Sequence, residues 1–207
     1  MSNVEKNLLK IKAVFLSPKK PFTWASGIIS PIYCDNRLVL SYPEVREEIE
    51  TALANLVKEK FPHCEILMGT ATAGIPHAAY VSDILYLPMG YVRSGNKEHG
   101  RQNKIEGHYE KGNKVVVVED LISTGKSSIE VVNSLIEAGV EVIGCVSIFS
   151  YGFDEAQQAF DSVNVPYYSL ANFNELVKVA VAEGYIENED LQDVLEWRKS
   201  PRTWRQN

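Results

Sequence analysis

The fold is decided by the stretch Lys114–Ser128, which reads KVVVVEDLISTGKSS. Its four consecutive valines predict a buried strand, because a continuous β-branched run is typical of a parallel sheet covered on both faces. Beyond the polar turn, apolar residues recur at helical spacing from Ile129 onward. We therefore expect a strand, two acids at its tip, a polar turn and then a helix.

The turn Ser123–Ser127 is a candidate phosphate site. It places backbone N–H groups at the start of a helix, where the first amides lack partners and the helix dipole favours an anion. Its hydroxyl side chains are expected to cap the helix and to donate to phosphate. The preceding acids, Glu119 and Asp120, would repel a bare phosphate. We therefore interpret them as partners of sugar hydroxyls or of a hydrated magnesium ion.

This stretch has two other interpretations. Gly125-Lys126-Ser127 resembles the end of a nucleotide-binding P-loop, G-x-x-x-x-G-K-[ST]. That motif needs glycine at position 120, where this chain has Asp120, so we reject the P-loop. For the stretch taken alone, an ordinary strand, turn and capped helix without a ligand remains open.

Composition limits the class of protein. The 207 residues, 45% of them hydrophobic, suffice for one α/β core with a small appended region. A net charge of −6 argues against general nucleic-acid binding. The three cysteines are far apart and form no metal-finger pattern, which predicts a reduced, cytoplasmic protein. The N-terminus does not resemble a signal peptide and no apolar run approaches membrane-spanning length, so we expect no membrane partner.

Strands that alternate with helices predict an α/β fold with a mostly parallel central sheet flanked by helices. We expect an amphipathic helix over Val4–Phe15, two short strands around a glycine turn within Pro21–Arg37, and a helix over Pro43–Phe61. Ligands of such sheets bind beyond the carboxyl ends of the strands. The turns that follow Gly69 and Glu119 should therefore share one rim.

The run Arg93–Lys104 is a concentrated basic segment. It holds two arginines, two lysines and a histidine but no apolar residue, so it should be an exposed loop. In an acidic chain such a loop indicates an anionic partner, although a solvated surface loop is the alternative. As a lid, it would close over an anionic leaving group and exclude water.

These motifs resemble one known family. Lys114–Ser128 is similar to the 5-phosphoribosyl-1-pyrophosphate (PRPP) motif of the type I phosphoribosyltransferases. Gly69–Pro76 matches G-x-x-x-x-G-I-P, a turn that lies beside the pyrophosphate in this family. Two further stretches resemble the orotate branch: the segment Phe22–Tyr33 matches F-T-x-x-S-G-x-x-S-P-x-Y, and Lys97–Gly100 reads KEHG. The chain departs from many members at Ala25, where a lysine is usual, and at Tyr151, where an Asp-Arg pair is usual.

The resemblance implies a fold and a reaction. It implies a type I phosphoribosyltransferase-like single domain over residues 1–207, with a small N-terminal hood (about 1–42) packed on a core (about 43–207). The reaction implied is Mg²⁺-dependent transfer of phosphoribose from PRPP to orotate, giving orotidine 5′-monophosphate and pyrophosphate for pyrimidine biosynthesis. Mg²⁺ would be held mainly through PRPP. The family also implies a homodimer in which the basic loop is shared between subunits.

It further implies roles for single residues. Arg93, Lys97 and His99 would act as catalytic residues on the departing pyrophosphate, and Ser123 would contact orotate. No protein residue is expected to ligate the metal directly. The implied PRPP-binding residues are Arg93, Lys97, His99, Glu119, Asp120, Leu121, Ile122, Ser123, Thr124, Gly125, Lys126 and Ser127.

Two other functions remain open at this point. The first is a phosphoribosyltransferase for another base such as a purine, which Ala25 and Tyr151 favour and the hood motif opposes. The second is a regulator that senses PRPP and binds nucleic acid, which the net charge of −6 and the basic loop motif oppose.

Overall fold

The computed structural model describes residues 3–24, 26–93 and 104–205. Its central sheet has the strand order β10-β9-β8-β5-β6-β7. Neighbouring strands are parallel except β6 and β7, which are antiparallel, so the predicted mostly parallel sheet is confirmed. The strands are β5 (Ile66–Thr70), β6 (Met89–Val92), β7 (Ile105–Glu106), β8 (Lys114–Ile122), β9 (Glu141–Ser150) and β10 (Tyr167–Asn172).

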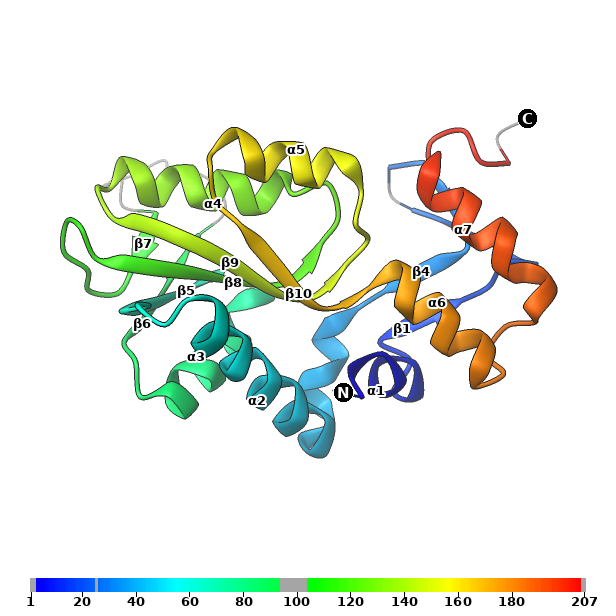
Figure 1. Ribbon diagram of the computed structural model, residues 1–207, viewed down its shortest axis with the longest axis horizontal. Helices are drawn as coiled ribbons and strands as arrows, with labels where there is room; N and C mark the ends of the chain where they lie inside the picture. Colours follow the sequence, from blue (N-terminus) through cyan, green and yellow to red (C-terminus); the bar gives the residue numbers. More distant parts are fainter. Residues whose placement is uncertain (1–2, 25, 94–103, 206–207) are drawn as a thin grey trace.

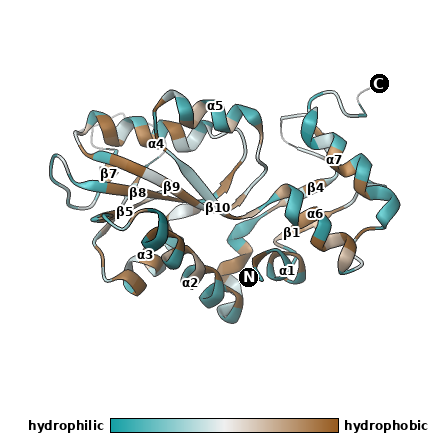
Figure 2. Cartoon of the chain, in the orientation of Figure 1, coloured by the Kyte–Doolittle hydropathy of each residue, from teal (hydrophilic) through white to brown (hydrophobic). Residues whose placement is uncertain are grey.

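Helices cover both faces of this sheet (Figure 1). α2 (Pro43–Lys60) and α3 (Gly74–Leu85) lie on one face, and α4 (Lys126–Glu137) and α5 (Asp154–Ser162) lie on the other. The apolar colouring of the central strands in Figure 2 follows from this double cover. No helix in the described part of the chain combines the length and the apolarity needed to cross a bilayer.

The four valines of β8 explain why this strand lies at the centre. Val116 and Val118 belong to the apolar core beneath α2 and α3, whereas Val115 and Val117 belong to the core beneath α4 and α5. Successive side chains of a strand point to opposite faces, so a run without a polar residue suits a strand that is buried on both.

The N-terminus departs from the sequence expectation. The predicted helix over Val4–Phe15 is wrong, because α1 ends at Lys10 and Val14–Leu16 forms strand β1. In β1 the outer residues are buried and Phe15 between them is exposed, which is the alternation of a half-buried strand. β1 pairs with β4 (Ile32–Cys34), and this pairing supplies the backbone partners that a longer helix would otherwise have given.

The hairpin expected within Pro21–Arg37 is confirmed as β2 (Phe22–Thr23) and β3 (Ile29–Ser30). The C-terminal helices α6 (Phe173–Ala182) and α7 (Leu191–Lys199) lie beside this N-terminal region (Figure 1). The indole nitrogen of Trp197 in α7 donates to the carbonyl of Ile29 at 2.9 Å.

The strand order reverses next to β5. From β5 the chain continues to β6 on one side, whereas β8 lies on the other side of β5. In open α/β sheets a ligand binds at such a switch point, outside the carboxyl ends of the strands. Here those ends are Thr70 of β5 and the acid-containing end of β8.

Candidate active site

The ends of β5 and β8 lie side by side, as the sequence predicted. Gly69 is paired with Val118, and the Thr70 hydroxyl donates to the Val118 carbonyl at 3.4 Å. The end of β9 joins the same rim, because the backbone N–H of Tyr151 donates to the carbonyl of Ile122 at 3.0 Å. Three turns that are far apart in the sequence therefore meet at the switch point.

The two acids at the end of β8 have different environments. Glu119 is only 6% exposed, and it accepts hydrogen bonds from the Ser128 hydroxyl at 3.3 Å and from the Asp120 N–H at 3.0 Å. Asp120 is half-buried. Burial, and then the neighbouring Asp120, raises the pKa of Glu119 to about 8. A raised pKa favours the neutral form of Glu119 near pH 7, which eases the approach of an anionic ligand.

This shift makes a prediction about stability. The folded-state pKa of Glu119 lies above its ordinary value, so the stabilisation due to the neutral acid is complete at low pH and is lost as pH rises through about 8. Glu119→Gln should therefore stabilise the ligand-free protein relative to wild type by on the order of 2 kcal/mol at pH 9, and by less at pH 6. Urea unfolding at both pH values measures the difference.

Glu65→Gln is the matched control, because a backbone hydrogen bond from Lys114 lowers the pKa of Glu65 instead. Loss of the Glu65 carboxyl group in Glu65→Gln should therefore give no stabilisation that grows with pH. An equal gain for Glu119→Gln at pH 6 and pH 9 would contradict the raised pKa of Glu119.

The turn after β8 differs from the expectation in one respect. The predicted serine or threonine cap of α4 is wrong: Gly125 is the N-cap residue, with φ +77°, and no side chain caps the helix. A left-handed conformation favours glycine at this position. The Gly125 carbonyl accepts a hydrogen bond from the N–H of Ile129. Lys126 and Ser127, which lie between these two residues in the sequence, are exposed. Without a side-chain cap, the first amides of α4 are available to an external acceptor.

The predicted PRPP-binding residues at positions 121–124 differ in where their side chains lie. Ser123 and Thr124 are half-buried at the rim. Ile122 belongs to the apolar core and Leu121 packs against the other core, so at these positions the backbone is the part available for ligand contact.

Arg93 directly follows β6, at the carboxyl end of the parallel strands where the other site residues lie. Its N–H donates to the Lys104 carbonyl at 2.8 Å, and its guanidinium pairs with Glu106 at 3.2 Å. A small cavity of about 70 Å³ is lined by Arg93 and Lys104 together with Thr70 and Ser127. Arg93 is therefore a neighbour of the predicted phosphate turn. Lys97 and His99 lie outside the described residues.

Tyr151 belongs to an aromatic cluster at the end of β9. Its ring stacks on Phe153, with centroids 5.4 Å apart, and lies 5.4 Å from the ring of Trp24. Trp197 of α7 contacts the same ring at 5.9 Å. Because Tyr151 is almost fully buried, the position after β9 joins the sheet to the N-terminal strands through packing.

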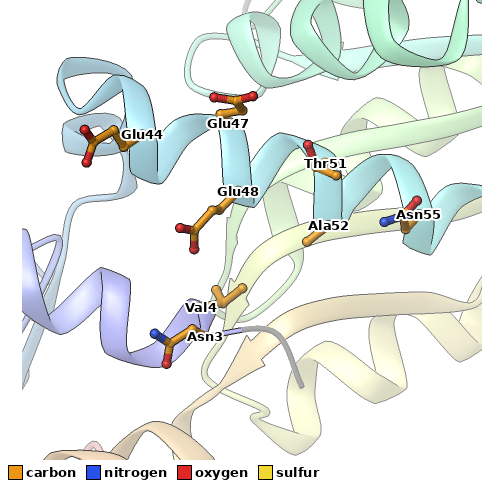
Figure 3. A pocket seen from close by; sticks show the side chains of 8 residues that line it. All are labelled: Asn3, Val4, Glu44, Glu47, Glu48, Thr51, Ala52 and Asn55. Carbon is orange, nitrogen blue, oxygen red and sulfur yellow. The ribbon is translucent and has the colours of Figure 1, made fainter.

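A larger recess lies elsewhere. It has a volume of about 720 Å³ and is lined by Glu44, Glu47 and Glu48 of α2, opposite Asn3 and Val4 (Figure 3). Three acids on one wall disfavour a phosphorylated ligand, so we do not place the site there.

Three polar residues outside the predicted set of site residues shape the rim. Ser128 directly follows the predicted turn Ser123–Ser127, and its hydroxyl donates to the Glu119 carboxyl group. Thr70 donates to the carbonyl of Val118 in β8, and Asn36 donates to the carbonyl of Asp120 in the same strand. Neither belongs to Lys114–Ser128, and their contacts arise only when the sheet assembles.

The rim and its acid-tipped central strand define a phosphoribosyltransferase. A sequence profile described as phosphoribosyl transferase domain matches residues 39–183, and the chain belongs to this family. An orotate phosphoribosyltransferase from Staphylococcus aureus is 56% identical over 195 residues, which cover 94% of this chain and 96% of that protein. One from Listeria innocua is 55% identical over 201 residues, covering 97% and 96%.

Structural comparison agrees. The crystal structure of orotate phosphoribosyltransferase from Aeropyrum pernix superposes with a TM-score of 0.76 at 28% identity, covering 85% of this chain and 97% of that one. The resemblance to the orotate branch of the family is confirmed, and so is the type I phosphoribosyltransferase fold with a mostly parallel sheet flanked by helices.

Proposed function

We propose that the protein transfers phosphoribose from PRPP to N1 of orotate, releasing pyrophosphate and forming orotidine 5′-monophosphate, a step of pyrimidine biosynthesis. The observation that carries this proposal is the end of β8. There a buried Glu119, a half-buried Asp120 and an uncapped helix start lie together at the switch point of the sheet. Relatives at 55–56% identity that are named for this reaction support the choice of base.

The proposed roles follow from where charge develops. As the bond from C1′ to the leaving oxygen breaks, the ribose becomes cationic and pyrophosphate gains negative charge, so catalysis requires stabilisation on both sides. Glu119 and Asp120 hold the ribose hydroxyls and lie near the cationic sugar. The amides and hydroxyls of Ser123–Ser127 hold the 5′-phosphate, and Lys126 adds positive charge.

The leaving group is assigned to the basic segment. Arg93, Lys97 and His99 neutralise the departing pyrophosphate, and His99 donates a proton to it. The position of Arg93 beside Thr70 and Ser127 supports this assignment.

Mg²⁺ would be held mainly through the oxygens of PRPP, and it would supply positive charge opposite the departing pyrophosphate. The half-buried Asp120 carboxylate can accept hydrogen bonds from the waters of a hydrated magnesium ion, which suits a metal that the substrate carries. Within residues 3–24, 26–93 and 104–205, no group of three His, Cys, Asp or Glu side chains is arranged to hold a metal ion.

The base is placed between the core and the hood. We assign Ser123 to orotate, and we treat residues 1–42 as a hood packed on a core that follows within one domain. The bond from Trp197 to Ile29 supports a hood that is tied to the C-terminal helix as well as to the sheet. The Tyr151 ring lies 5.4 Å from the ring of Trp24, and this contact supports one wall of the proposed base site.

We also infer a cytoplasmic homodimer in which the loop after Arg93 reaches the site of the other subunit. Apolar side chains on α3 and just after it support an interface. Tyr80 and Ile84 are 40% and 45% exposed, and Tyr86 is 96% exposed. All three cysteines are free thiols, which suits a reducing compartment, and the charge of −6 does not suit a nucleic-acid partner.

The proposal is tested by the absorbance of orotate after mixing the protein with PRPP, Mg²⁺ and orotate. We expect a decrease that requires all of them. Release of pyrophosphate only with hypoxanthine, adenine or uracil would assign another base. No reaction with any base would favour a PRPP sensor, and salt-dependent binding to nucleic acid would then support that alternative.

A further inference from the structure

One side chain links the N-terminal strands to the acids of β8. Asn36 opens the 3₁₀ helix η1 (Asn36–Ser41) and is fully buried. Its Nδ2 donates to the backbone carbonyl of Asp120 at 2.7 Å, although the two residues are 84 positions apart in the sequence.

This bond gives a partner to a carbonyl of β8 that lies beyond the pairing with β5. The pairing of β5 with β8 ends at Gly69 and Val118, whereas β8 continues to Ile122. Alternate carbonyls along a strand point to the same edge, so the carbonyls of Val118 and Asp120 both face the edge where β5 ends. The Thr70 hydroxyl satisfies the first carbonyl, and the Asn36 amide satisfies the second.

A second contact orients the amide. The Cys34 thiol donates to Oδ1 of Asn36 at 3.4 Å, which leaves Nδ2 directed at the Asp120 carbonyl. Cys34 ends β4, and β4 is paired with β1. A continuous series of contacts therefore runs from the N-terminal strands through Asn36 to the backbone of Asp120.

We propose that Asn36 is a positioning residue for the transfer reaction, which fixes the backbone at Asp120 and so couples the Asp120 carboxylate to the hood. The inference rests on the proposed function, because it requires PRPP at the end of β8. Without the amide, the Asp120 carbonyl must find water or move, and a small displacement of the carboxylate weakens its contact with the ribose.

The test compares Asn36→Leu with Asn7→Leu. Asn7 is also a buried asparagine, and its Nδ2 donates to Glu48 at 2.6 Å, between α1 and α2 and away from the rim. Both variants lose one buried amide and should lose similar thermal stability. We expect Asn36→Leu to raise the Kd and the KM for PRPP about tenfold and to lower kcat, whereas Asn7→Leu keeps both PRPP constants within about twofold of wild type.

Calorimetric titration of the wild-type chain with PRPP and Mg²⁺ comes first, and it separates the two ideas. A wild-type chain that does not bind PRPP would overturn the proposed function, and this inference with it. If wild type binds but both leucine variants keep its PRPP affinity, the inference alone is overturned. If Asn36→Leu does not fold, Asn36→Ser replaces it. Its hydroxyl is too short to reach the carbonyl, so we expect a PRPP KM at least about threefold above wild type, and an unchanged KM would contradict the role of Asn36.

Discussion

A hybrid dimer of two inactive chains, one carrying Lys97→Ala and the other Asp120→Asn, is expected to show about half the wild-type turnover. Each variant alone should lose about a hundredfold or more in kcat/KM, because in the proposed mechanism each removes a charge that opposes charge developing in the transition state. If the loop reaches the partner, one active site of the hybrid combines the intact Asp120 of one chain with the intact Lys97 of the other chain. The second site lacks both groups. Differently tagged chains, co-expressed and purified through both tags, give the hybrid for the orotate assay.

The reciprocal hybrid is the matched control. It pairs a wild-type chain with a chain that carries both substitutions. If the loop serves the partner's site, each site of this control lacks one group and the dimer is inactive. A loop that served its own chain would reverse both results, leaving the first hybrid inactive and the control at about half of wild type. A monomeric wild-type protein in sedimentation would contradict the dimer directly.

Gly74→Ala is expected to destabilise the protein by about 3 kcal/mol. A Cβ atom at Gly74 would lie 2.5 Å from the Thr70 hydroxyl and closer still to the carbonyl oxygen of Val118. One of these atoms belongs to the backbone of the central strand, which cannot turn aside as a flexible side chain would. Relief therefore requires α3 and β8 to separate, just before Glu119. Urea denaturation, with the slope checked for two-state behaviour, measures the loss.

Gly112→Ala provides the comparison. Gly112 has φ +84° and open space around its Cβ position, so alanine there meets backbone strain but no collision. Its cost should be about 1 kcal/mol. Equal costs at the two positions would contradict the collision at Gly74. A Gly74→Ala protein that remains folded should also bind PRPP more weakly, because the same displacement moves the acids.

The strand, the acids and the turn of Lys114–Ser128 could be predicted because the signals are local. A β-branched run specifies a strand covered on both faces, whatever packs against it. The helix over Pro43–Phe61 was likewise indicated by its own proline, acids and lysines, and α2 occupies Pro43–Lys60. Where competing local patterns overlapped, the prediction failed. Val4–Phe15 fits a helix, yet pairing with β4 turns Val14–Leu16 into a strand.

Some acids and amides gained their roles only from tertiary contacts. In the sequence Glu50 is one of several acids of α2. In the structure its Oε1 lies 2.6 Å from Nδ1 of His77 in α3, and burial raises the pKa of Glu50. The elevated pKa of Glu119 has the same cause, with Asp120 contributing.

Local sequence signals specify the class of fold, the turn after β8 and the acids beside it, since these depend on residues close together in the chain. Three other properties arise only from the tertiary structure: the raised pKa of Glu119, the glycine N-cap of α4 and the partner of the Asp120 carbonyl. These properties depend on burial and on hydrogen bonds between distant segments, which exist only once β5, β8 and the N-terminal strands have assembled.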